Sequence, residues 1–213
     1  MNRGWSAVVL IAGSVLACLR TTTKAEHMTQ SVASPDTTHP WRKPGDKVDS
    51  ILPMEEYLRR FRLGLTEPGR LEGGEHSREA LAREFLSAVS LRDTTRLTGL
   101  MISRAEFAWL VFPQHIYSRP PYELDPALHW LQIQARTQKG FTRTLNRLAN
   151  HPLTFLSMHC QRDTVQLAIG RTRLWSDCRL HYRDGENEQV RRLFGSIVER
   201  NGRFKLFSLA NDF

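Results

Sequence analysis

Hydrophobic residues between Pro53 and Pro113 recur at the three- and four-residue spacing of amphipathic helices. Each apolar run follows a residue that favours a helix N-terminus, so the pattern predicts four short helices. The four starting signals are Pro53, Ser77, Asp93 and Ser103, and the last of them forms an S-x-x-E capping box with Glu106.

A longer helix is predicted from Asp125-Pro126 to about Ala149, because an N-cap residue followed by proline is a strong start signal. Pro152 ends it. Gly140 marks the position of an expected kink. The predicted apolar stripe consists of Leu131, Ala135, Phe141, Leu145 and Leu148.

After Pro152 the hydrophobic period changes to the alternation that is typical of strands, as in Val165, Leu167 and Ile169. Asp184-Gly185 and Asn201-Gly202 are hairpin signals. We therefore expect the last third of the chain to form a curved, four-stranded antiparallel sheet. Strands are expected at 153–159, 178–182, 193–198 and 204–209. Helices followed by an antiparallel sheet define an α+β fold.

The last two predicted strands carry apolar residues at both parities, as Leu206 and Phe207 illustrate. A sheet that is apolar on both faces needs a second covering layer. One candidate for that layer is a second copy of the chain, so the pattern suggests a homodimer through the sheet.

The order of elements over 77–213, and the closing sequence RLFGSIVERNGRFKLFSLANDF, resemble the nuclear-transport-factor-like, or cystatin-like, α+β cone. In that fold a long helix lies across a bent sheet, and the two enclose a pocket. The resemblance is architectural, since no catalytic motif carries it. It implies a cone-like core over about 77–213.

The first 18 residues have the pattern of an export signal. Arg3 is followed by an uncharged run from Ser6 to Ala17, which is too short to span a membrane but suits a signal peptide. Val15-Leu16-Ala17-Cys18 resembles the bacterial lipobox, which implies lipidation of Cys18. Ordinary secretion and an uncleaved anchor are the alternatives. We expect an exported, lipid-anchored protein of the periplasm or cell envelope.

Residues 19–48 lack apolar periodicity and are rich in threonine, serine and proline, which is the composition of a disordered tether. The predicted organisation is therefore a signal over 1–18, a linker over 19–48 and one α+β domain over 49–213.

The distribution of charged residues along the chain does not indicate a nucleic-acid partner. The formal net charge is +8, but acidic residues interleave with the basic ones, and no run of Lys or Arg exceeds two residues. Phosphate-backbone binding needs clustered cations. The pattern favours a mixed, solvated surface.

Cys160 and Cys178 are the cysteines besides Cys18, and an even pair in an exported protein favours a disulfide. Free thiols are one alternative. A zinc site that adds His159 and His181 is another, although residues 178 and 181 of one strand point to opposite faces. No metal and no cofactor is expected.

A ligand pocket is the remaining candidate site, and aromatic side chains near its expected mouth suggest a lining of Trp109, Tyr122, Trp130 and Trp175. His115, Tyr117 and His129 belong to the same group, and simple core packing is the alternative for the helical tryptophans. Arg171 and Arg173 suggest either an anion site or a solvated strand edge. His159, His181 and Asp212 are the acid–base candidates.

The leading hypothesis is a non-catalytic module that binds a small apolar ligand or another envelope protein. The second is an isomerase, dehydratase or hydrolase of the cone type, which would need a buried ionisable residue with a partner. The third is a dimeric scaffold without a cavity. No G-x-S-x-G, GK[ST] or HExxH motif occurs in the sequence.

Overall fold

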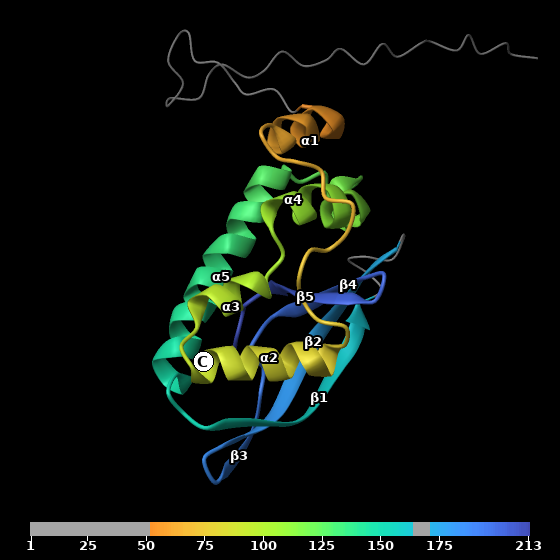
Figure 1. Cartoon of the computed structure of the whole chain (residues 1–213). Helices are drawn as coiled ribbons and strands as arrows, with labels where there is room; N and C mark the ends of the chain where they lie inside the picture. The colour runs from red at the N-terminus through yellow and green to blue at the C-terminus, as the bar shows by residue number, and fades with distance from the viewer. Residues whose placement is uncertain (1–51, 164–170) are drawn as a thin grey trace, which may run out of the picture. The chain divides into compact units, whose positions relative to one another are not determined.

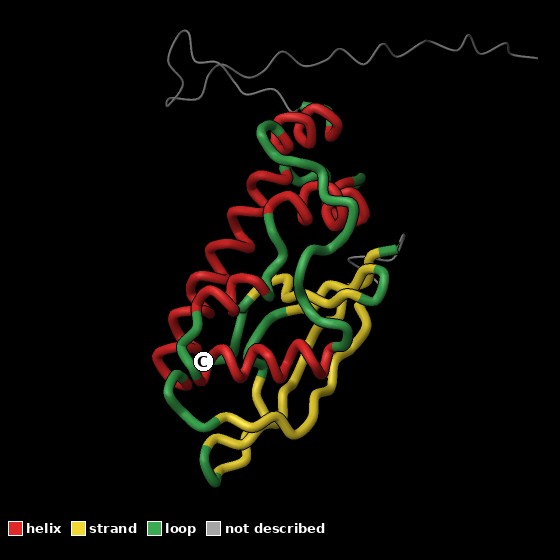
Figure 2. The backbone as a smooth tube through the Cα atoms, in the orientation of Figure 1, coloured by secondary structure: helices red, strands yellow, loops and turns green. Residues whose placement is uncertain are grey.

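Helices occupy the first half of the described chain and strands the second (Figure 1, Figure 2). The computed structural model describes residues 52–163 and 171–213. The predicted signal, Cys18, the linker and the alternating run at 165–169 lie outside the described residues. The described part is α+β, with helices packed on an antiparallel sheet, and this confirms the predicted fold class.

The predicted helix starts are found where the capping residues place them. The Oγ of Ser77 accepts from the backbone N of Ala80 at 3.0 Å, and Ser103 and Glu106 form the reciprocal capping box. Side-chain oxygens thereby satisfy backbone donors that the first helical turn leaves free. The helices are α1 (Met54–Arg62), α2 (Arg78–Ser90), α3 (Thr94–Gly99), α4 (Arg104–Glu106) and α5 (Pro126–Leu148).

The chain after α4 changes its winding instead of forming one regular helix. It continues as a π-helical segment, η1 (Phe107–Val111), and two 3₁₀ turns, η2 (Phe112–Gln114) and η3 (Ile116–Ser118). Side chains from elsewhere bond its carbonyls: the Oγ1 of Thr172 donates to the carbonyl oxygen of Leu110 at 2.8 Å. The altered winding buries most of η1.

The sheet has five strands within the described residues, not the four predicted. They are β1 (Leu153–Asp163), β2 (Thr172–Asp184), β3 (Asn187–Arg191), β4 (Ser196–Arg200) and β5 (Arg203–Ser208). The order is β1-β2-β4-β5, and β3 also pairs with β2. Because β2 is long, β3 and β4 each pair with a different part of it.

Leu193 and Phe194, which were predicted to begin a strand, lie between β3 and β4. Both are fully buried, because the chain turns their side chains into the core at this break. The sheet is open and curled, so the cone implied by the resemblance stays a prediction.

Two predicted hairpin turns are confirmed. Asn201 and Gly202 have φ values of 52° and 74°, as a two-residue turn between β4 and β5 requires. Gly185, with φ of 61°, begins the turn between β2 and β3.

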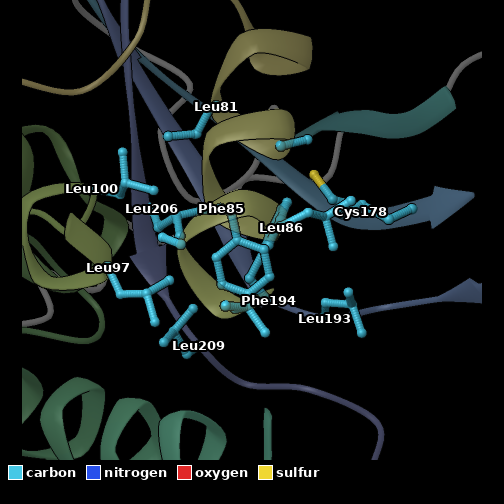
Figure 3. Close-up of a cluster of buried hydrophobic side chains, with 14 of the residues drawn as sticks. Leu81, Phe85, Leu86, Leu97, Leu100, Cys178, Leu193, Phe194, Leu206 and Leu209 are labelled. Carbon is cyan, nitrogen blue, oxygen red and sulfur yellow. The ribbon is translucent and has the colours of Figure 1, made fainter. Parts of the chain in front are cut away.

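Both faces of the sheet are covered by the chain itself. On one face Phe85 of α2 packs edge-on against Phe194, with ring centroids 5.3 Å apart, and Leu206 joins this cluster (Figure 3). On the other face Phe207 packs with residues of η1 and α5. The apolar residues at both parities are therefore covered in large part within one chain, and a homodimer through the sheet stays a prediction.

The buried side of α5 agrees with the predicted stripe in part. Leu145 and Leu148 are buried as predicted, but Leu131 is 64% exposed and Ala135 is also exposed, whereas His129 and Ile133 are buried. The chain just after β5 passes close to Gly140: an added Cβ there would lie 1.6 Å from the carbonyl oxygen of Leu209. Gly140 permits this close approach, which was not part of the sequence prediction.

Cys160 and Cys178 form the predicted disulfide, with sulfur atoms 2.11 Å apart. They lie on the neighbouring strands β1 and β2, where the pairing shifts register between His159 and Gln161. The bond links residues 18 positions apart and belongs to the larger core cluster.

We predict that Gly140→Ala lowers the free energy of unfolding by about 1–3 kcal/mol or more, because the methyl group would have to push Leu209 away from α5. Urea unfolding followed by circular dichroism measures the change. Gly99→Ala is the matched control, since its added methyl meets nothing within 4 Å. Equal stabilities for the two variants would contradict the close packing of α5 on the last strand.

Candidate functional site

A cleft of about 810 Å³ lies between α3 and α5 and is called the α3–α5 cleft below. Figure 1 labels the two helices that flank it. The loop at Glu72 and Gly73 and the side chain of Lys205 complete its lining. The loop is held at the edge of the sheet because Glu75 and Phe204 exchange two backbone hydrogen bonds of 2.9 and 2.8 Å.

The lining combines apolar walls with neutral hydrogen-bonding groups. The apolar residues are Met101, Ile102, Trp130 and Phe141. The neutral polar residues are Thr94, Thr98, Ser103, Gln134, Thr137 and Gln138. A cleft of this size that combines apolar walls with polar groups is typical of sites for small molecules.

Three charged side chains also line the cleft, and two of them, Glu106 and Lys205, are among the most buried in the described chain. Glu106 is 1% exposed and Lys205 is 4% exposed. The Nζ of Lys205 lies 2.9 and 3.1 Å from the two carboxylate oxygens of Glu106, and it also donates to the carbonyl oxygen of Glu72 at 2.7 Å. The pair therefore connects α4, β5 and the Glu72 loop.

The carboxylate of Glu106 has further partners in the backbone. It accepts from the N–H of Glu72 at 2.6 Å and from the N–H of Ser103 at 2.7 Å. Buried charges need such complete pairing, because removal from water is costly. Since the protein itself supplies these partners, the pair is organised as a structural link.

Of the four predicted pocket residues, Trp130 alone lines the α3–α5 cleft. Its ring centroid lies 5.1 Å from that of Phe107. The other three lie elsewhere. Trp109 has the guanidinium of Arg62 over its ring at 4.9 Å, and it packs with the smaller core cluster.

Tyr122 and Trp175 are also outside the cleft. Tyr122 is 58% exposed, with its ring 5.6 Å from that of Tyr117. The indole N–H of Trp175 donates to Glu199 at 3.1 Å, and Arg78 stacks on its ring at 4.0 Å. The structure does not gather the predicted aromatic residues because they occupy different elements and faces.

The acid–base candidates are not brought together either. His159 is exposed on β1, His181 lies 3.0 Å from the carboxylate of Glu188 on the neighbouring strand, and Asp212 pairs with Arg192. Arg173 bonds Glu199 at 3.0 Å, which fits the reading of a solvated strand edge.

The alternative zinc site would lack thiolate ligands, because the sulfur atoms of Cys160 and Cys178 are joined in the disulfide. Across 52–163 and 171–213 there is no cluster of three metal-ligating side chains.

Sequence reasoning assigned Glu106 to a helix cap and gave Lys205 no role. A signal for Lys205 was present, because it is the one charged residue between the apolar residues Phe204 and Leu206 on a strand. A lysine within a buried strand needs an anionic partner. The identity of that partner could not be read from the sequence, because 99 positions separate the two residues.

We predict that Lys205→Met lowers the free energy of unfolding by about 3–5 kcal/mol, because it leaves the carboxylate of Glu106 buried without its cation. The double variant Glu106→Gln/Lys205→Met should be more stable than Lys205→Met alone, since the unpaired charge is then removed. Urea unfolding of the wild type, both single variants and the double variant measures this coupling. Additive losses would contradict it.

None of the helices in the described ranges is sufficiently long and apolar to cross a membrane. A scan against protein-family models, a search of curated proteins and a search of solved structures each find no match to this chain.

Proposed function

We propose that this chain is a binding domain that takes a small, largely apolar ligand in the α3–α5 cleft. The observation that carries the proposal is the chemistry of the lining: aromatic and aliphatic walls, neutral amides and hydroxyls, and a buried ion pair whose charges are matched inside the protein. A ligand would gain apolar contact with Trp130 and Phe141. It would find neutral partners in Gln134 and Gln138 on the same helix.

Charge further limits the class of ligand. Glu72 is an exposed carboxylate among the lining residues, and no ion pair joins it to another described residue. The cleft therefore disfavours anions, so the proposed ligand is a molecule without negative charge that has an apolar body and one or two hydrogen-bonding groups.

A neutral fluorescent dye, Nile red, tests the proposal without knowledge of the natural ligand. Thr98→Trp places a bulky ring in the cleft and should weaken dye binding by about tenfold or more, by excluding the dye from its apolar contacts. Fluorescence titration of the folded protein measures the dissociation constant.

Thr95→Trp is the matched control, because it makes the same substitution on the same helix at an exposed position outside the lining. It should bind the dye within about twofold of the wild type. If both variants bind the dye equally well, or if the wild type does not bind it, the cleft is not the ligand site.

A second candidate function is catalysis of the isomerase, dehydratase or hydrolase type. The observation that favours it is the pair of buried ionisable groups, Glu106 and Lys205, on the wall of a cleft. Proton transfer from either group would first have to break a hydrogen bond that the fold uses. This requirement makes binding without catalysis the preferred function.

We also propose that the domain is exported and lipid-anchored through Cys18. The apolar leader that ends in Val15-Leu16-Ala17-Cys18 supports this, and a disulfide in the domain fits an oxidising compartment. Two acyl chains on one residue would hold the protein stably at a membrane.

Intact mass of the protein from the membrane fraction of a bacterial expression host tests the anchor. The wild type should carry the added mass of the lipid, whereas Cys18→Ala should lack it and leave the membrane fraction. Cys160→Ser/Cys178→Ser is the control for loss of cysteine in general, and it should remain lipidated. A wild-type protein without lipid would contradict the anchor.

A further inference from the structure

A second hollow, of about 290 Å³, lies on the opposite flank of α5 from the cleft. Its lining includes His129 and Arg136 of α5, and Ser176, Ser196 and Ser208 from the sheet strands β2, β4 and β5. We call it the serine hollow. It is several times larger than the space that one water molecule occupies, which is about 30 Å³ in the liquid.

The serine hollow contains a buried polar atom that has no protein partner. Ser208 is 8% exposed and His129 is 7% exposed. The Nδ1 of His129 has no hydrogen-bond partner among the described residues. Buried polar groups are nearly always hydrogen-bonded, so this atom indicates that a ligand supplies its partner.

Ser176 and Ser196 also line the hollow, and each carries a hydroxyl that can donate a hydrogen bond. Hydroxyls from three strands that line one hollow are suited to an acceptor with several oxygen atoms. They can rotate to donate to it without rearrangement of the backbone.

The charges around the serine hollow favour an anion. Arg192 is paired with Asp212, and Asp177 lies 3.4 Å from Arg179. Arg136 is exposed, and in the described part of the chain no carboxylate pairs with it. The uncompensated charge at the hollow is therefore the positive charge of Arg136.

The pKa of His129 is affected by the positive charge of Arg136 as well. Burial, the neighbouring His115 and the charge of Arg136 lower the pKa of His129 from 6.5 to about 4. The other titratable and charged groups that line the hollow are Tyr117, Asp177 and Arg192. At neutral pH the imidazole is uncharged, so it can donate one hydrogen bond and accept another.

We propose that the serine hollow binds a small oxyanion, either a carboxylate or a phosphate group, through Arg136 and the hydroxyls of Ser176, Ser196 and Ser208. A guanidinium matches the geometry of either group, and hydroxyl donors complete its coordination. The site does not depend on the α3–α5 cleft, because α5 presents different side chains to the two spaces.

Titration of the folded protein with sodium phosphate, and separately with sodium acetate, tests this site at an ionic strength held constant with sodium chloride. NMR of the His129 ring follows binding. A bound anion changes the electrostatic surroundings of the imidazole, so its ring resonances should shift to a saturating value at neutral pH, where both probes are anionic. The probe with the lower dissociation constant identifies the chemical class.

Arg136→Gln should weaken binding of the preferred anion by about tenfold or more, because a charged hydrogen-bond donor is lost. Arg143→Gln is the matched control: it removes the same charge from an exposed position on the same helix, away from the lining. It should change the dissociation constant by less than about twofold.

Ser208→Ala should weaken binding as well, since it removes one donor and leaves the charge unchanged. Equal weakening by Arg136→Gln and Arg143→Gln would show that the anion only screens surface charge, and the proposal would be overturned. Absence of any change at His129 with both anions would overturn it too.

Discussion

The buried ion pair between Glu106 and Lys205 is the interaction on which the arrangement of the site depends. A lysine inside a sheet face is tolerated only where an anion meets it, so α4 must lie over β5. The same lysine bonds the carbonyl oxygen of Glu72 and so draws the Glu72 loop to the sheet. Three segments that are far apart in the sequence meet at this pair, and their meeting forms one wall of the α3–α5 cleft.

Helix α5 lines both the α3–α5 cleft and the serine hollow, and it presents different side chains to each. Trp130, Gln134 and Phe141 follow one another at helical spacing on the flank that lines the cleft. His129 and Arg136 lie on the other flank, at the serine hollow. The side between them packs against the end of the sheet, where Gly140 lets α5 approach Leu209 closely. One helix thus separates an apolar, neutral space from a polar space with positive charge.

The proposed export and the chemistry of the domain agree with each other. A disulfide between β1 and β2 persists in an oxidising compartment, where a leader of this composition would deliver the chain. A tether over 19–48 would let the domain stand clear of a membrane while its two spaces remain accessible to solutes.

The sequence by itself determined the elements that depend on local interactions. The caps at Ser77, Asp93, Ser103 and Asp125, and the turn at Asn201-Gly202, were predicted correctly because each involves residues within four positions of one another. The cysteine pair was predicted from compartment and parity, and the α+β class from the change of period after Pro152.

The tertiary structure alone decided the rest, since long-range contacts leave weak traces in a linear pattern. The inward side of α5 was predicted correctly at Leu145 and Leu148 but wrongly at Leu131 and Ala135, and the close approach of Leu209 to Gly140 was not predicted. The partner of Lys205 is 99 positions away, so only folding could identify it. Of the four aromatic residues predicted to line a pocket, Trp130 alone lines the cleft. Whether a side chain lines a cavity depends on how its helix or strand is oriented in the fold, and the local sequence does not encode that orientation.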